Sequence, residues 1–176
     1  MKNLFLPDGR FATFDEVGAD FLAEEGIRAL ILDIDNTLEP YENDLPGERV
    51  LRWLDELHAA GIRTAIVSNN NRERVERFNE SLGMPVFWKA KKPLSGAVKK
   101  ALAALGARPQ EAAFLGDQIF TDVLAGHLAS MRAYLVPPIR DRRDLLTRAK
   151  RLLERPILAR YERKKRKKKK AEEKHG

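Results

Sequence analysis

The sequence predicts an α/β protein with three layers, in which helices cover both faces of a parallel β-sheet. Helical and strand-like segments alternate along most of the chain, which is typical of βαβ units. The strand-like segments are short and continuously apolar, as strands buried on both faces are. Glycines follow four of the helical segments, at Gly26, Gly61, Gly83 and Gly106, where a helix C-cap needs a positive φ.

The first half of the chain supplies three predicted helices and two predicted strands. Residues 1–14 are expected to be irregular because they contain proline and glycine, and Asp15 can cap the helix that follows. Apolar residues such as Val50 and Leu54 recur at helical spacing in the second helix. The helices are expected over residues 15–25, 47–60 and 72–82, and the strands over residues 27–34 and 62–67.

The second half continues the alternation. Pro93 suits the first turn of a helix that follows a basic loop. Asp141 can cap a last helix, whose apolar stripe includes Leu152 and Leu153 and which Pro156 breaks or kinks. Strands are expected over residues 85–88, 112–115 and 133–136, with a further helix over residues 119–128.

Length and composition restrict the class of protein. The 176 residues, of which 43% are hydrophobic, suffice for one core-forming domain. The sequence has no cysteine, which excludes disulfides and thiolate metal sites and fits a reducing compartment. It has no signal-peptide pattern, and no apolar stretch approaches the roughly 20 residues needed to span a bilayer. We therefore expect a cytoplasmic protein that is soluble or peripherally attached to a membrane.

The net charge of +7 is located at the C-terminal end. Residues 160–176 hold ten of the 33 Lys/Arg and three of the 26 Asp/Glu, so residues 1–159 are neutral overall. A block of like charge is usually disordered and often serves as an interaction arm. The sequence therefore predicts a folded domain over residues 1–159 and a polybasic, disordered tail over residues 160–176.

Two aspartates, Asp33 and Asp35, come at the end of the first predicted strand of the sheet. One residue separates them, so in an extended chain both side chains point the same way. Carboxylates this close raise each other's pKa unless a cation or a shared proton relieves the repulsion. The pair could be two solvated acids in a turn, but an open α/β sheet binds its ligands at this rim.

Further polar residues follow the other predicted strands. Ser68 and Asn69 come after the second strand, Lys92 after the third, and Asp117 with Asp122 after the fourth. The carboxyl ends of parallel strands share one edge, so these groups can converge on the acidic pair. Carboxylate oxygens favour Mg²⁺, while a hydroxyl, backbone N–H groups and a lysine suit a phosphate. The combination predicts phosphoryl transfer.

Four segments resemble the four motifs of the haloacid dehalogenase (HAD) superfamily phosphatases. They are Asp33-Ile34-Asp35-Asn36-Thr37-Leu38, Ser68-Asn69, Lys92-Pro93 and Gly116-Asp117-Gln118-Ile119-Phe120-Thr121-Asp122. The resemblance covers about residues 1–150. The residues around the second, third and fourth motifs are similar to those of the YqeG branch of subfamily IIIA. That branch is in turn similar to the mitochondrial phosphatidylglycerophosphate phosphatase. His127 stands where that branch would have Asn. Because this position follows the catalytic motif, the difference does not indicate a loss of activity.

The resemblance implies a role for each motif residue in catalysis. Asp33 would be the nucleophile that forms an aspartyl-phosphate. Asp35 would protonate the leaving alkoxide and then deprotonate the hydrolytic water. Ser68 and Asn69 would hold phosphate oxygens, and Lys92 would neutralise the phosphate and the nucleophile.

The same resemblance implies Mg²⁺ as the cofactor. Its ligands would be Asp33, the main-chain carbonyl of Asp35, and Asp117. Asp122 would ligate the metal through water or orient Lys92. The cation would let a carboxylate approach a phosphate dianion.

Some alternatives remain open at this point. Lys89 and Lys91 compete with Lys92 for the lysine role, and Asp122 could be an ordinary acid in the first turn of a helix. The rival fold is a receiver domain, which also binds Mg²⁺ with carboxylates at strand ends. Its phospho-acceptor lies on a middle strand, where this chain has Ser68-Asn69.

The spacing of the motifs indicates an active site without a cap domain. Only short loops follow Leu38 and separate Gly83 from Lys92, the two places where relatives carry a cap. An open site suits a phosphate displayed on something large, such as a lipid head group, a protein or a nucleic acid. The resemblance implies phosphatidylglycerophosphate as the substrate, and another large or soluble phosphate ester is the alternative.

The basic residues 160–170 suggest a partner. They could hold the protein to an anionic membrane, at about 1 kcal/mol per Lys or Arg near the surface, with Ile157, Leu158 and Tyr161 dipping into the bilayer. They could also bind RNA or a ribosome, or simply form a solubilising tail.

Overall fold

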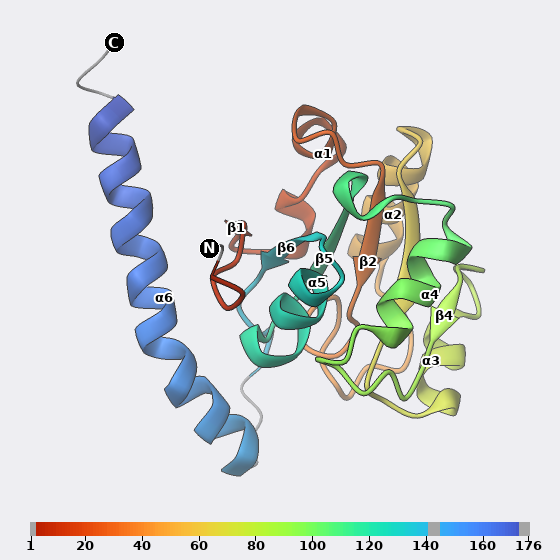
Figure 1. Ribbon diagram of the computed structural model, residues 1–176. Helices are drawn as coiled ribbons and strands as arrows, with labels where there is room; N and C mark the ends of the chain where they lie inside the picture. Colours follow the sequence, from red (N-terminus) through yellow and green to blue (C-terminus); the bar gives the residue numbers. More distant parts are fainter. Residues whose placement is uncertain (1–2, 141–144, 173–176) are drawn as a thin grey trace.

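The computed structural model describes residues 3–140 and 145–172, with side chains for residues 3–140 and 152–167. Its centre is a six-stranded parallel sheet with the strand order β1-β6-β5-β2-β3-β4 (Figure 1). The strands are β1 Gly9–Arg10, β2 Ala29–Leu32, β3 Arg63–Val67, β4 Val86–Phe87, β5 Ala112–Gly116 and β6 Arg132–Leu135. The predicted fold class is confirmed, because the buried side chains form clusters on both faces of this sheet.

Helices form the two outer layers. Side chains of α1, α2 and α3 are buried on one face of the sheet, and those of α4 and α5 on the other. The bounds are α1 Ala19–Glu24, α2 Glu48–Ala59, α3 Arg72–Asn79, α4 Gly96–Ala104, α5 Leu124–Leu128 and α6 Leu145–Glu172, with the short helices η1 Phe14–Glu16, η2 Pro109–Glu111 and η3 Ile119–Val123. The four glycines expected to end helices all have φ between 57° and 79°.

Strand β1 corrects the expectation that residues 1–14 are irregular. Gly9 and Arg10 pair with β6 in parallel register. Two residues are too few to produce a recognisable alternation of side chains. A Cβ on Gly9 would lie 3.0 Å or less from ring atoms of Phe11 and Tyr134, so the aromatic packing at this edge requires glycine.

The predicted N-cap of the first helix is wrong. α1 begins at Ala19, and Asp15 lies in η1 instead. The carboxylate of Asp15 accepts hydrogen bonds from Thr13 and from Arg49 on α2. These contacts hold residues 13–16 in a tight turn, and the helix starts only after it.

The predicted start of the helix at Pro93 is also wrong. α4 begins three residues later, at Gly96. Lys91 has a φ of 55°, and its carbonyl accepts a hydrogen bond from the N–H of Leu94. The chain therefore makes a turn around residue 92 before the helix can begin.

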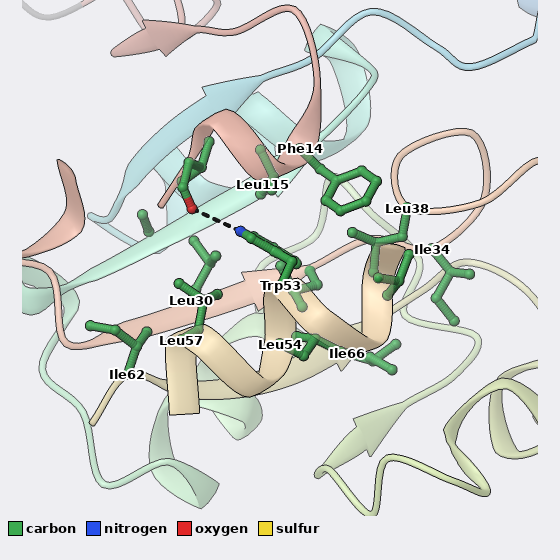
Figure 2. Close-up of a cluster of buried hydrophobic side chains, with 14 of the residues drawn as sticks. Phe14, Leu30, Ile34, Leu38, Trp53, Leu54, Leu57, Ile62, Ile66 and Leu115 are labelled. Atoms are coloured by element: carbon green, nitrogen blue, oxygen red, sulfur yellow. Dashed lines mark hydrogen bonds between the residues drawn. The ribbon is translucent and has the colours of Figure 1, made fainter. Parts of the chain in front are cut away.

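The larger buried cluster lies between the sheet and helices α1 to α3 (Figure 2). Trp53 on α2 donates its indole N–H to the carbonyl of Val17 at 3.1 Å and packs edge-on against Phe14, with ring centroids 5.1 Å apart. Ile34 and Leu38 are fully buried in the same cluster. They anchor the chain on either side of Asp35 and so fix the rim of the sheet at the end of β2.

α6 runs along the β1 edge of the sheet and continues beyond it (Figure 1). Pro156 lies inside this helix and does not end it, and the helix continues into the basic segment as far as Glu172. The structure thus differs from the disorder expected from residue 160 onward. The proposed cap Asp141 and residues 173–176 lie outside the described residues, and the division into a domain and a tail stays a prediction.

Packing explains why α6 persists through Pro156. Ile157 and Leu158 pack against a small buried cluster beside η3 and β6, and Glu162 pairs with Arg10 at 3.0 Å. This packing offsets the backbone hydrogen bond that a proline lacks. Leu152 and Leu153, expected in the packing stripe, are instead 61% and 62% exposed.

Candidate active site

The carboxyl ends of three neighbouring strands bring the predicted site residues to one edge of the sheet. The strands β5, β2 and β3 are adjacent. Asp117 directly follows β5, Asp33 directly follows β2, and Ser68 directly follows β3. All three residues are buried.

Lys92 bridges two carboxylates at this edge. Its Nζ lies 2.7 Å from Oδ1 of Asp33 and 2.8 Å from Oδ1 of Asp122. The Lys92 side chain is 2% exposed, whereas Lys89 and Lys91 are exposed at the surface. Among the three lysines of this loop, Lys92 is therefore the one that reaches the carboxylates.

For each partner of this ion pair, burial and the neighbouring opposite charge shift the pKa in opposite directions. Burial raises the pKa of Asp33 to about 7, with a further contribution from Asp122, while the ammonium of Lys92 works in the opposite direction. Burial acts to lower the pKa of Lys92, but the carboxylates of Asp122 and Asp33 outweigh it, so the pKa of Lys92 is raised. The lysine thus stays charged, while full ionisation of Asp33 needs more positive charge nearby.

Three carboxylates of the site could hold a metal ion, which would provide this positive charge. One oxygen each of Asp33, Asp117 and Asp122 lie within 4.8 Å of one another. With Lys92, which pairs with Asp33 and Asp122, they form what we call the lysine cluster. A set of buried carboxylate oxygens suits a hard cation. The donor set therefore fits Mg²⁺, and Asp35 adds no side-chain oxygen to it.

Asp35 belongs to a second group of side chains. Nδ2 of Asn70 donates to one carboxylate oxygen of Asp35 at 3.0 Å, and Nη2 of Arg74 donates to the other at 3.1 Å. The Arg74 side chain is 8% exposed, and its guanidinium lies over the ring of Phe78, 5.6 Å from the centroid. We call Asp35, Asn70 and Arg74 the arginine cluster.

Sequence analysis did not identify Arg74 or the contact of Asn70. Arg74 lies in the first turn of α3, and its N–H donates to the N-cap side chain of Asn71 at 2.9 Å. The Asn71 cap predicts where α3 begins, and a helix that begins at the sheet edge turns residues of its first turn toward that edge. An arginine three residues after this cap was therefore the sequence feature that could have indicated Arg74 as a site residue.

Ser68 and Asn69 hold the backbone of the site. Oγ of Ser68 accepts the N–H of Asn70 at 3.1 Å. The side chain of Asn69 accepts the N–H of Lys92 at 2.7 Å and donates to the carbonyl of Lys92 at 3.3 Å. Asn69 thus ties the lysine loop to the end of β3, and the phosphate contacts of both residues stay a prediction.

A cavity of about 360 Å³ adjoins the loop that follows Asp35. Its floor is formed by residues 37–40, and its walls come from the segments after β1 and β6 and from the start of α2. The lining is mostly apolar and includes Phe14, Leu38, Pro138 and Ile139. It offers room for a carbon-rich group beside the catalytic edge.

Comparisons with known proteins identify relatives of this chain. A family model for haloacid dehalogenase-like hydrolases matches residues 7–130. The chain is 35% identical over 164 residues to the probable phosphatase YqeG of Bacillus subtilis (strain 168), which covers 93% of this chain and 95% of that protein. It is 28% identical over 115 residues to a glyceraldehyde 3-phosphate phosphatase of Pyrococcus furiosus, which covers 60% of this chain and 47% of that protein. A HAD-superfamily hydrolase from Ehrlichia chaffeensis has the same fold, with a TM-score of 0.53 at 18% identity over 62% of this chain and 90% of that one.

Proposed function

The chain belongs to the haloacid dehalogenase-like hydrolases and is a phosphatase of that superfamily, and we propose that it hydrolyses phosphatidylglycerophosphate to phosphatidylglycerol. The phosphatase chemistry rests on one observation, the lysine cluster at the carboxyl edge of the sheet. The choice of lipid rests on the resemblance to the YqeG branch. The remaining features of the structure are compatible with it.

The reaction we propose has two steps on Asp33. In the first step, a carboxylate oxygen of Asp33 bonds to phosphorus and the bond to the ester oxygen breaks, while Asp35 gives its proton to the leaving alkoxide. In the second step, Asp35 takes a proton from water, the water oxygen bonds to phosphorus, and the bond to Asp33 breaks. Phosphate leaves, and both carboxyl groups return to their starting states.

The lysine cluster prepares Asp33 for the first step. Asp33 can attack only as the carboxylate, and Lys92 at 2.7 Å favours that form. Asp33, Asp117 and Asp122 would hold Mg²⁺, which would offset the repulsion between carboxylate and phosphate. Asp122 keeps Lys92 in place through its own ion pair.

The arginine cluster prepares Asp35 for proton transfer. Asn70 and Arg74 each hold one oxygen of the Asp35 carboxyl group, which fixes its orientation. A proton carrier must lie within hydrogen-bond reach of both the leaving oxygen and the water. Each carboxylate oxygen accepts one of these hydrogen bonds and has a second lone pair for such a contact.

Two features support a lipid substrate. The connections that could carry a cap domain, residues 39–47 and 88–95, are loops without strands or helices of their own, so a head group can approach from a bilayer. The apolar cavity beside residues 37–40 suits the carbon part of such a substrate. Within residues 3–140 and 145–172, no helix is both long and apolar enough to cross a bilayer.

The exposed cations of α6 support a membrane partner. Among residues 152–167, whose side chains are described, they are Arg155, Arg160, Arg163, Lys164, Lys165, Arg166 and Lys167. Ile157 and Leu158 pack on the protein body, which corrects the expectation that they dip into the bilayer. We propose that these exposed cations contact anionic head groups by charge alone, at about 1 kcal/mol per residue near the surface.

A lipid phosphatase assay tests this function. We expect the wild-type protein to release phosphate from phosphatidylglycerophosphate in mixed micelles with Mg²⁺, and Asp33→Asn to abolish the release. Ile139→Glu, which places a charge in the lining of the apolar cavity, should slow hydrolysis of the lipid but not of a soluble phosphate ester. If the wild type leaves the lipid intact and cleaves only the soluble ester, the lipid assignment fails.

The same exposed cations also favour a second candidate, an RNA- or ribosome-associated protein. Lys and Arg side chains bind a phosphate backbone with a steep dependence on salt. Flotation with anionic vesicles and a gel shift with RNA, at matched salt, distinguish the two partners. Binding to ribosomes that survives Asp33→Asn and disappears on deletion of residues 160–176 would favour the second candidate.

A further inference from the structure

One buried carboxylate connects α6 to the catalytic edge. Glu154 is 6% exposed, and its Oε1 accepts the backbone N–H of Ile119 at 2.7 Å. Ile119 is the first residue of η3. A charged acceptor makes this hydrogen bond stronger than one between neutral groups, so it fixes the start of η3 against α6.

The segment that receives this bond carries two members of the lysine cluster. Asp117 lies two residues before Ile119, and Asp122 lies three residues after it. The N–H of Gln118 donates to Oδ2 of Asp122 at 3.0 Å, and the carbonyl of Gln118 accepts the N–H of Asp122 at 3.0 Å. Residues 118–122 are therefore one hydrogen-bonded unit that begins directly after Asp117, and Glu154 contacts its second residue.

This unit has little room to move toward the sheet. A Cβ on Gly116 would lie 2.4 Å from Cβ and Cγ of Asp122, so η3 folds tightly against the end of β5. On the other side, Ile157 and Leu158 of α6 pack against side chains of η3 and β6. η3 is thus held between the sheet and α6, and Glu154 supplies a polar contact at that interface.

We propose that Glu154 is a positioning residue for Asp117 and Asp122, which makes α6 a part of the active site. The inference rests on the proposed function only in treating these two aspartates as metal ligands. A ligand pair held at the correct separation binds a cation without first having to order the loop. Loss of the Glu154 contact should therefore weaken metal binding more than it weakens contact with the phosphate ester.

Two substitutions at Glu154 and one control test the proposal. Glu154→Leu removes the acceptor and keeps an apolar side chain in a buried position, whereas Glu154→Gln keeps an acceptor without the charge. Glu162→Gln is the control, because Glu162 lies on the same face of α6 but pairs with Arg10 at the surface. The first measurement is the Mg²⁺ concentration that gives half of the maximal thermal stabilisation, which requires no substrate.

We expect the half-saturating Mg²⁺ concentration to rise about tenfold in Glu154→Leu, and less than threefold in Glu154→Gln and Glu162→Gln. With p-nitrophenyl phosphate, kcat at low Mg²⁺ should fall in Glu154→Leu while KM for the ester changes less than twofold. A folded Glu154→Leu protein with wild-type Mg²⁺ dependence would overturn the proposal, as would an equal rise in Glu162→Gln.

Two further outcomes are covered by the same experiment. If Glu154→Leu does not fold, Glu154→Met replaces it, because the more flexible side chain adapts to the same space. If the wild type hydrolyses no phosphate ester, the proposed function fails, while the Mg²⁺ titration of thermal stability still decides the role of Glu154.

Discussion

The two acidic clusters on either side of Ile34 differ in how their charge is balanced. The lysine cluster holds three carboxylates and one ammonium, all of them buried. The arginine cluster holds one carboxylate against one guanidinium and an amide. The first cluster therefore gathers buried carboxylate oxygens of the kind that suits a hard cation. The second holds both oxygens of one carboxylate, and its guanidinium also pairs with Asp44 at 3.9 Å, so it suits a group whose orientation must be kept.

The largest effect is expected when the lysine cluster loses its ammonium. In Lys92→Met the carboxylates of Asp33 and Asp122 lose their buried partner, which typically costs about 3–5 kcal/mol. Chemical denaturation in the presence of a chelator should show this loss, and Mg²⁺ should restore part of it. Lys91→Met is the matched control, because Lys91 is exposed in the same loop. Equal stabilities of the two variants would contradict the charge balance described above.

The lysine cluster should also make the metal-free protein sensitive to pH. The pKa of Asp33 is about 7 in the folded protein and near 3.8 when unfolded, so the folded state binds the extra proton between these values. The free energy of unfolding should therefore fall as pH rises from about 4 to about 7, by about 1.4 kcal/mol per unit of pKa difference at most. Lys92 adds no slope in this window, because its raised pKa keeps it charged throughout.

Denaturation curves at several pH values, recorded with a chelator, measure this slope. Asp33→Asn should flatten it, since the amide does not titrate. Asp20→Asn, at an exposed aspartate, should leave the slope unchanged. A wild-type stability that rises between pH 4 and pH 7 would contradict the expected pKa of Asp33.

The arginine cluster should respond in rate rather than in metal binding. In Arg74→Ala, Asp35 loses the guanidinium that holds one of its oxygens at 3.1 Å, and we expect kcat to fall about 10- to 100-fold because the proton carrier is less well oriented. KM and the Mg²⁺ dependence should change little. Arg72→Ala on the same helix removes an exposed ion pair with Glu76 and a contact with the ring of Trp88, and serves as the control. A rise in half-saturating Mg²⁺ for Arg74→Ala would contradict the separation of the two clusters.

The members of the lysine cluster could be predicted from the sequence because they follow the ends of the predicted strands. Asp33 and Asp117 come directly after continuous apolar runs, and a parallel sheet places such positions on one edge. Arg74 and Glu154 reach the site from helices. Their orientation depends on how α3 and α6 pack on the sheet, which no local pattern contains. Pro156 even suggested a break or a kink in the last helix, where the structure continues it.

The smallest effect that still distinguishes the clusters concerns Asn69. Its side chain makes two hydrogen bonds to the backbone of Lys92, at 2.7 Å and 3.3 Å, and so places the lysine without touching its ammonium. Asn79 makes the same pair of bonds to the backbone of Met84, at 3.0 Å and 2.9 Å, away from the catalytic edge. Asn69→Ala and Asn79→Ala should therefore lose similar stability, about 1 kcal/mol per hydrogen bond.

Only Asn69→Ala should also lose activity, by about tenfold in kcat, because a small displacement of Lys92 weakens its contact with Asp33. Steady-state kinetics on a soluble phosphate ester at saturating Mg²⁺, together with thermal unfolding of both variants, measures the two effects. Equal losses of kcat in both variants would mean that loop stability, rather than the position of Lys92, limits the reaction. A loss confined to Asn69→Ala would mean that the lysine cluster depends on where its single ammonium is held.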